Sequence, residues 1–545
     1  MGNAYDAIVV GGGHNGLVAA AYLARSGLRT VVLESRASVG GAATTERPWP
    51  EHPQLSVTRL SYVMSLMPPT ILADLQLARH GYKVHPMGPY YQAFPEGGSL
   101  TIHDDDPART HEQIEQWSSK DARAWEEWHE WLGRLADVLG PLLMTVPPTV
   151  GSHAPRDVAD LARLVWRHRG VDARTVADLT RLMTMSIADL LDEWFESPEV
   201  KGAMAVNGVI GTWAGPYEPG TAYVMAHHSI GGVGDGQLGS WGYPEGGMGA
   251  VSAAIRSSAE SFGAEIRTDA PVASLLVTDG RVEGAVLESG EELRASTVVT
   301  SLHPKRAFLE QVGATHLPDD FVRDIERWRS RSGVVKINLA IDRLPNFTAD
   351  PSEGQAEHHT GSVEMAPTMT YIERAFLDAR EGRPALAPFA DGVIPTTLDR
   401  TLNPDGTHIF SLFTQWVPED WSREPHAEEL EDYTDRLIDL YDAVAPGFRE
   451  SIIARDIVGP HQMETEYGLI GGNIFHGELS LEQMFHLRPA PGYADYRTPI
   501  DGLYFAGSAT HAGGGVCGIP GMQAARAAIK DARARWSRLR AAVGR

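Results

Sequence analysis

Apolar positions at the start of the chain follow a strand period, then a helical period, then a strand period again. Residues 7–10 are a short β-branched apolar run, typical of a buried parallel strand. The alanine-rich residues 17–26 predict a helix closed by Gly27, and residues 30–33 predict a second buried strand that ends on Glu34. Strand, helix and strand in this order indicate a parallel α/β sheet.

Helical periodicity dominates residues 105–205. Trp125, Trp128 and Trp131 recur every third residue, so they share one helix face. Two interpretations stay open for that face: a packed core, or the wall of a cavity for an apolar substrate. Residues 174–197 predict one further amphipathic helix, stopped by the proline that follows.

Strand patterns return in the second half of the chain. The Asp279-Gly280 pair predicts a hairpin turn between two of these strands. Residues 305–465 also contain long loops, and they hold no motif whose chemistry is readable from the sequence. The predicted strands are residues 274–278, 282–288, 292–300, 334–341, 408–414 and 503–506, and the predicted helices are residues 250–262, 428–444 and a long one that begins near Pro520.

The turn after the first strand carries Gly11, Gly13 and Gly16 in the spacing G-x-G-x-x-G. The first glycine allows a tight turn, the second lets backbone approach a pyrophosphate, and the third lets the helix pack closely on the strand. The helix N-terminus offers amide donors to phosphates, and Glu34 can accept hydrogen bonds from ribose hydroxyls. An acidic residue at that place favours FAD or NAD over NADP.

Composition limits the range of functions. With 545 residues the chain is long enough for two or three domains, and a net charge of −24 argues against nucleic acid as a partner. A single cysteine, Cys517, excludes a disulfide framework and a C-x-x-C redox pair. No H-E-x-x-H or similar spacing appears, so we predict no metal.

Neither a secretory signal nor a run long enough to span a bilayer is visible. The longest candidate, residues 135–146, is interrupted by Asp137 and by Gly140-Pro141. We therefore expect a cytoplasmic protein without a transmembrane segment, and peripheral membrane contact stays open.

A second strand–glycine–helix unit lies near the C-terminus, where residues 503–506 lead into a glycine-rich turn and a long helix. A flavin needs such a unit, because backbone amides and a helix N-terminus stabilise the negative charge that its ring acquires on reduction. Two such units, one at each end of the chain, favour FAD over NAD.

These motifs resemble those of the phytoene desaturase and flavin amine oxidase superfamily. The resemblance rests on the glycine fingerprint, on Glu34, on Gly40-Gly41 and on a small-residue run before the G-V-x-G at 515–518. Residues 61–66 (SYVMSL) and 77–82 (LARHGY) are similar to the branch of pyridine nucleotide-disulphide oxidoreductase domain-containing protein 2. Ala42 replaces the arginine that usually follows the Gly-Gly pair.

The resemblance implies an α/β fold: a doubly wound FAD/NAD(P)-binding Rossmann-like domain with a discontinuous mixed α+β substrate domain. The FAD-binding domain would comprise residues 1–70, 225–303 and 470–545, and the substrate domain residues 71–224 and 304–469. FAD is expected to be bound non-covalently, with the backbone of Val272 at the adenine edge. The implied cofactor-binding residues are Gly11, Gly13, Gly16, Glu34, Arg36, Gly40, Gly41, Ala42, Val272, Gly507, Ser508, Gly515 and Val516.

The expected function is that of an FAD-dependent oxidoreductase of desaturase or dehydrogenase type, taking hydride from a C–C or C–N bond of a fairly apolar substrate. The alternatives are a flavin amine or alcohol oxidase that uses oxygen, and a non-catalytic FAD-binding interaction protein. The electron acceptor stays open among oxygen, a quinone and a nicotinamide. Because the cofactor supplies the hard step, no strong acid–base pair is required.

Four side chains are candidates for a role in the chemistry. His511 lies in the flavin turn, and His227 and His228 form a pair, so each is a candidate catalytic helper. A histidine pair is also commonly structural. Cys517 has three possible roles: neutral filler, polar modulator of the flavin, or covalent flavin link.

Overall fold

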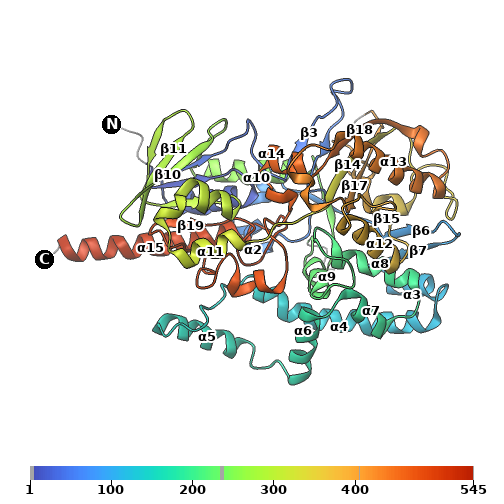
Figure 1. The fold of residues 1–545 in the computed structure, drawn as a ribbon, viewed down its shortest axis with the longest axis horizontal. Helices are drawn as coiled ribbons and strands as arrows, with labels where there is room; N and C mark the ends of the chain where they lie inside the picture. Colours follow the sequence, from blue (N-terminus) through green and yellow to red (C-terminus); the bar gives the residue numbers. More distant parts are fainter. Residues whose placement is uncertain (1–4, 234–238, 404, 544–545) are drawn as a thin grey trace.

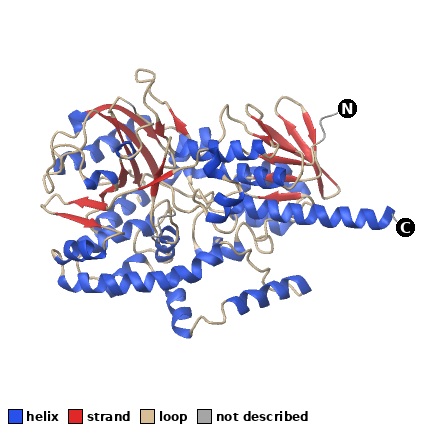
Figure 2. Cartoon of the chain, turned by 180° about the vertical axis from the view of Figure 1, so that it is seen from behind, coloured by secondary structure: helices blue, strands red, loops and turns tan. Residues whose placement is uncertain are grey.

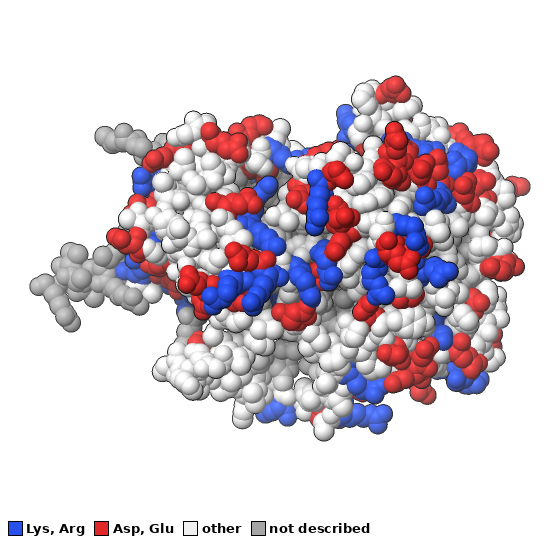
Figure 3. Space-filling view, in the orientation of Figure 1, with Lys and Arg blue, Asp and Glu red and all other residues white. Residues whose placement is uncertain are grey.

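The computed structural model describes residues 5–233, 239–403 and 405–543. Two β-sheet regions lie at opposite ends of the molecule, and the helices and loops that connect them lie between and below (Figures 1 and 2). On the face in Figure 3, acidic and basic side chains are interspersed. No helix of the described residues is both long enough and apolar enough to cross a bilayer.

The first sheet is parallel and has the strand order β19-β13-β1-β2-β9. Side chains alternate across it, as the strand period requires. Ala7 and Val9 of β1 pack against the helices α1, α10 and α15, while Ile8 and Val10 pack on the opposite face. The strands are β1 (Ala7–Val10), β2 (Thr30–Leu33), β9 (Glu265–Arg267), β13 (Val298–Thr300) and β19 (Leu503–Phe505), and the helices are α1 (His14–Arg25), α10 (Met248–Ser261) and α15 (Ile519–Val543).

The opposite face of this sheet is covered by a three-stranded antiparallel sheet, β10 (Val272–Thr278), β11 (Arg281–Leu287) and β12 (Glu292–Arg294), and by α11 (Asp319–Arg327). The hairpin predicted at Asp279-Gly280 is confirmed. The single strand predicted for residues 292–300 is wrong, because β12 ends in the small sheet and the chain then enters β13 of the parallel sheet. Both layers bear out the predicted fold class.

A seven-stranded mixed sheet forms the other β region, in the order β18-β14-β17-β16-β15-β6-β7. Helix α13 (Ala427–Val444) packs on it through Leu437 and Tyr441, which belong to the same apolar core as Ile337 and Phe410. The strands are β6 (Tyr90–Ala93), β7 (Ser99–Ile102), β14 (Val334–Ile341), β15 (Ser362–Met365), β16 (Phe389–Val393), β17 (His408–Gln415) and β18 (Ile452–Val458).

The helical region predicted for residues 105–205 is confirmed, but the helix predicted over residues 174–197 is two helices. Ser186 interrupts it by capping a new helix, with its side chain accepting from the Asp189 amide at 2.9 Å. Pro198 then begins a third helix instead of only ending one. The helices are α3 (Pro107–Glu115), α4 (Ser119–Leu143), α5 (Pro155–Arg167), α6 (Ala173–Thr184), α7 (Ile187–Trp194) and α8 (Pro198–Val209).

Smaller elements connect the two β regions. β5 pairs with β8, and β3 pairs with β4. The remaining strands and α-helices are β3 (Thr45–Glu46), β4 (Val57–Thr58), β5 (Val84–Pro86), β8 (Gly242–Pro244), α2 (Pro69–Asp74), α9 (Thr221–Ser229), α12 (Met369–Arg380) and α14 (Pro460–Tyr467). The division of the chain into an FAD-binding and a substrate domain stays a prediction.

Candidate flavin and substrate site

The glycine fingerprint lies where β1 ends and α1 begins. Gly11 has φ +94°, a conformation that L side chains rarely adopt. A Cβ on Gly16 would lie 2.0 Å from the Gly11 carbonyl oxygen, so only glycine permits this packing of helix on strand. Beside Gly13, in contrast, no heavy atom lies within 4 Å of an added Cβ. The second glycine therefore faces open space, as approach of a pyrophosphate requires.

Neighbouring loops converge on the fingerprint. Gly40 bridges to Gly13, which brings the Gly-Gly-Ala run beside the turn. Glu34 is buried at the end of β2, and its carboxylate accepts from the Gly12 amide at 2.6 Å and the Arg36 amide at 2.9 Å. These bonds hold the carboxylate at the carboxyl edge of the sheet, where the phosphates and ribose of a dinucleotide bind in such folds.

The C-terminal unit interlocks with the N-terminal one. Asn15 in α1 donates to Ser508 Oγ at 3.4 Å, and a Cβ on Gly521 in α15 would lie 2.1 Å from the Asn15 carbonyl oxygen. Gly507 and Ser508 follow β19, and Ala506 pairs with β13 through its amide. The two ends of the sequence thus form one site.

Several buried polar atoms around this site have no partner within the described residues: His14 Nε2, Asn15 Oδ1 and Arg36 Nη1. Arg36 otherwise pairs with Glu46 at 2.8 Å and lies over the Tyr467 ring. Buried polar groups are normally hydrogen-bonded. The unsatisfied atoms, together with the open space beside Gly13, fit a dinucleotide cofactor.

Val272 begins β10, and its carbonyl accepts from Gln311 Nε2 at 2.9 Å. Gln311 is buried, and its Oε1 has no partner among the described residues. The side chain of Gln311 thus stands beside the backbone predicted to lie at the adenine edge. The sequence did not indicate this residue.

A buried arginine braces the turn predicted to hold the flavin. Arg488 is 1% exposed, and its guanidinium donates to backbone carbonyls that include those of Ser508 at 3.0 Å, Thr510 at 3.1 Å and Phe475 at 2.9 Å. Burial lowers the pKa of Arg488 to about 9. Its donors tie loops far apart in sequence to the flavin turn, and sequence reasoning missed it.

The three candidate histidines are buried and bonded to carbonyl oxygens. His227 Nε2 lies 3.3 Å from Gly514 O, His228 Nδ1 lies 2.9 Å from Val224 O, and His511 Nε2 lies 3.0 Å from Leu142 O. Burial lowers the pKa of His227 to about 3 and that of His511 to about 4, and it also lowers the pKa of His228. His228 lines the cavity described next.

A cavity of about 590 Å³ lies between the flavin turn and the seven-stranded sheet. Ala42, Ser508, Gly515 and Val516 line it, as does His14, which stands between the second and third fingerprint glycines. Its apolar lining includes Leu60, Trp125, Trp128, Leu132, Met204, Val206, Ile210 and Phe413. Trp128 also belongs to the apolar core that includes the seven-stranded sheet, so it is both a core residue and part of the cavity wall.

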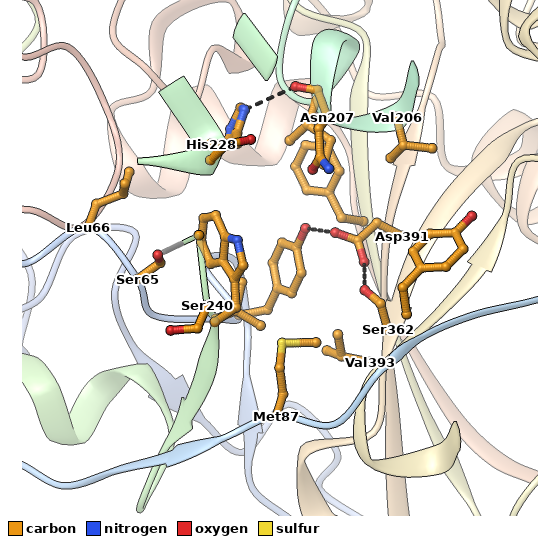
Figure 4. A pocket seen from close by; sticks show the side chains of 18 of the residues that line it. Ser65, Leu66, Met87, Val206, Asn207, His228, Ser240, Ser362, Asp391 and Val393 are labelled. Carbon is orange, nitrogen blue, oxygen red and sulfur yellow. Dashed lines mark hydrogen bonds between the residues drawn. The ribbon is translucent and has the colours of Figure 1, made fainter. Parts of the chain in front are cut away.

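The sheet side of the cavity is polar, and strand register explains why. Glu364 on β15 stands directly opposite Asp391 on β16, Asp391 opposite Phe413 on β17, and Phe413 opposite Lys336 on β14. Partners in register point to the same face of a sheet, and all four line the cavity. Asp391 accepts hydrogen bonds from Ser362 Oγ and from the hydroxyl of Tyr62. Figure 4 shows His228 and Leu66 across the cavity from Asp391.

Burial shifts the pKa values of two side chains on this face, Glu364 and Lys336. Burial and the neighbouring Asp391 raise the pKa of Glu364 well above its usual range. Burial lowers the pKa of Lys336 to about 7. Lys336 Nζ donates to Asn338 Oδ1 at 3.0 Å and to Ser411 Oγ, and lies 5.3 Å from the centre of the Tyr62 ring.

These sheet residues lie in the part of the chain whose chemistry the sequence did not reveal. One signal was present: Lys336, Glu364 and Asp391 each interrupt a strand of apolar residues. A charged residue in the middle of a buried strand requires a partner or a shifted pKa. Which charged residues meet depends on strand pairing, which the sequence pattern alone does not provide.

Cys517 is buried and free. Burial raises the pKa of its thiol to about 11, so the thiolate that a covalent flavin link needs is disfavoured. It packs in the apolar core behind the turn with Met522 and Ala525. This environment favours the role of neutral filler.

Two protein-family models match this chain. A family model described as an NAD(P)-binding Rossmann-like domain matches residues 9–74, and one described as flavin containing amine oxidoreductase matches residues 207–533. The chain is 41% identical to pyridine nucleotide-disulfide oxidoreductase domain-containing protein 2 of Rattus norvegicus, over 97% of this chain and 94% of that protein.

Two more distant similarities extend over nearly the whole chain. A lycopene-forming phytoene desaturase of Pantoea ananas is 22% identical over 96% of this chain and 98% of its own length. The solved structure of an oxidoreductase from Methanosarcina mazei matches with a TM-score of 0.59 and 16% identity, over 96% of this chain and 99% of that one. The latter similarity concerns the fold alone.

Proposed function

The chain belongs to the flavin-containing amine oxidoreductase family and is an FAD-dependent oxidoreductase, and from this premise we propose that it takes hydride from a C–C or C–N bond of a fairly apolar small molecule. When bound, FAD supplies the hydride acceptor, the N5 atom of its ring. The residues that would hold it are those of the fingerprint, Glu34, Arg36, residues 40–42, Val272 and residues 507–516.

One observation carries the proposal: the same cavity is lined by the flavin turn at Gly515 and Val516 and by an apolar wall from α4 and α8. Its volume of about 590 Å³ suits a small-molecule ligand, since such sites typically span about 300–1,000 Å³. The apolar wall would exclude water and align the reacting bond with the flavin turn.

The candidate histidines receive a positioning role in this proposal. With pKa values of about 3 and about 4, His227 and His511 are neutral at pH 7 and weak bases. Through Gly514 and Leu142, both fix backbone at or beside the flavin turn. We assign no proton transfer to them.

A second candidate, an amine or alcohol oxidase that passes electrons to oxygen, is favoured by the polar sheet side of the cavity. A substrate that carries an amine or hydroxyl has hydrogen-bond donors for such a surface, whereas a pure hydrocarbon has none. The electron acceptor decides between an oxidase and a dehydrogenase.

The test is anaerobic reduction of the purified flavoprotein by a panel of polyenes, amines and alcohols, followed at the flavin absorption bands. We expect at least one class to bleach the flavin within seconds to minutes. Reoxidation is then followed separately with oxygen, a soluble quinone and a nicotinamide, and peroxide release identifies the oxidase. A flavin that dithionite reduces but no panel compound does would contradict the proposal and support a non-catalytic role.

A further inference from the structure

We propose that Glu364 and Asp391 form a head-group subsite that binds a hydrogen-bond-donating head, a hydroxyl or an ammonium, of an amphipathic substrate. This proposal rests on the proposed function and names its substrate class. The apolar part of the ligand lies along α4 and α8, and the head lies against β15 and β16.

The first argument is an unsatisfied acceptor. Both oxygens of Asp391 are engaged, Oδ1 by Ser362 Oγ at 2.8 Å and Oδ2 by the hydroxyl of Tyr62. Glu364 is 3% exposed and lines the cavity, and its Oε2 has no partner among the described residues. A buried acceptor without a donor costs free energy that a ligand O–H or N–H removes.

A second unsatisfied atom lies on the same face. The hydroxyl of Tyr90 is buried without a partner within the described residues, and Tyr90 also lines the cavity. Tyr90 on β6 stands in register with Ser362 on β15. Glu364 is two residues after Ser362 on the same strand, so both side chains point to the same face of the sheet. A hydroxyl ligand can donate to Glu364 and accept from Tyr90, and an ammonium can donate to both.

The charges on this face disfavour an anionic head group. The cation of this face, Lys336, stands two strands away from Asp391, and its Nζ already donates to Asn338 and Ser411. A carboxylate head beside Glu364 and Asp391 would meet a negative charge and an acceptor without a donor of its own. A pure hydrocarbon would leave Glu364 Oε2 unsatisfied.

The position of the subsite suits the chemistry of the flavin turn. An added Cβ on Gly515 would lie 2.5 Å from Leu66 Cδ1, so Leu66 marks the flavin side of the cavity. Figure 4 shows Leu66 on the side opposite Asp391 and Ser362. A ligand whose head binds at the sheet thus presents a more distant part of its chain to the flavin turn.

Binding of four ligands with the same chain tests the subsite: decylamine, 1-decanol, decanoate and decane. Dissociation constants are measured with the FAD-loaded protein by tryptophan fluorescence, because Trp125 and Trp128 line the cavity. We expect decanol or decylamine to bind at least about tenfold more tightly than decane and decanoate. Equal affinity for decane, or tightest binding of decanoate, would overturn the proposal.

Two variants of Glu364 test whether this residue causes the head-group preference. Glu364→Leu removes the acceptor and should abolish the head-group preference, while binding of decane is kept or improved. Glu364→Gln keeps a carbonyl oxygen as acceptor but cannot carry a negative charge, so it should retain decanol and weaken decylamine at least about tenfold if the head is an ammonium. A full preference in both variants contradicts the subsite.

The matched control is Glu373→Gln, with Glu373→Leu beside it. Glu373 also has a buried Oε2 without a partner among the described residues, and it is not one of the residues that line the cavity. These controls should keep the wild-type preference. Unchanged flavin absorption and circular dichroism establish that each variant is folded. Affinity is read without flavin reduction, so failure of the proposed redox function is distinguishable from failure of the subsite.

Discussion

The two ends of this molecule encode their functions differently. At the nucleotide end, Gly11, Gly13 and Gly16 act through backbone geometry, within a few residues of one another. On the sheet side of the cavity, Lys336, Glu364 and Asp391 lie on three strands, and only the pairing of the sheet brings their side chains together. The fingerprint is thus a local backbone motif, whereas the polar face of the cavity is made of side chains from far apart in the sequence.

The largest effect is expected from a substitution at Gly16, where helix and strand approach closely. Replacing it with valine places side-chain carbon against the Gly11 carbonyl, and we expect a cost of about 3 kcal/mol, at the upper end of what overpacking typically costs. We expect loss of bound flavin, measured as the ratio of flavin to protein absorbance, and a lower midpoint of urea unfolding.

Gly140→Ala is the control for this variant. Gly140 lies inside helix α4 with no heavy atom within 4 Å of an added Cβ. Alanine there should keep the flavin and change stability by at most about 1 kcal/mol, in the stabilising direction. Full flavin loading of Gly16→Val would show that helix and strand need not approach closely.

Lys336→Met tests the buried side-chain network of the other end. The folded-state pKa of Lys336, about 7, lies below its usual value of 10.5, so the unfolded chain binds more protons between these values. Wild-type stability therefore rises with pH across this window, by about 2–3 kcal/mol between about pH 6 and about pH 9 relative to the methionine variant.

The measurement is the difference in unfolding free energy between wild type and Lys336→Met at several pH values. Taking the difference removes titrations common to both proteins. Asp391 and Asp456 are the carboxylates that favour the charged form of Lys336, and they are present in both the wild type and Lys336→Met. A difference that does not change with pH would show that Lys336 keeps an ordinary pKa.

The smallest expected effect is at Cys517. Cys517→Ala leaves a small void in the core behind the flavin turn and should cost about 1 kcal/mol. Flavin loading should not change, and acid precipitation of the wild type should release all the flavin. Flavin that stays with the precipitated wild-type protein, and not with the variant, would contradict non-covalent binding.

Much of the fold was predictable because its signals are local. The strand–turn–helix–strand unit, the hairpin at Asp279-Gly280 and the helix at Ala427–Val444 follow from the spacing of apolar and turn residues. The errors occurred where local patterns are ambiguous. Residues 292–300 read as one strand, although the chain changes sheets within them, and the break at Ser186 needed its cap to be recognised.

For the candidate site, the sequence by itself determined the cofactor end. Positive φ and close backbone approach require glycine, so the residue type reveals the geometry. Only the tertiary structure revealed the Arg488 brace behind the flavin turn and, on the sheet side of the cavity, the pair of Glu364 with Asp391. Side chains can become neighbours through many different strand pairings, and the choice among them depends on long-range packing of the whole chain.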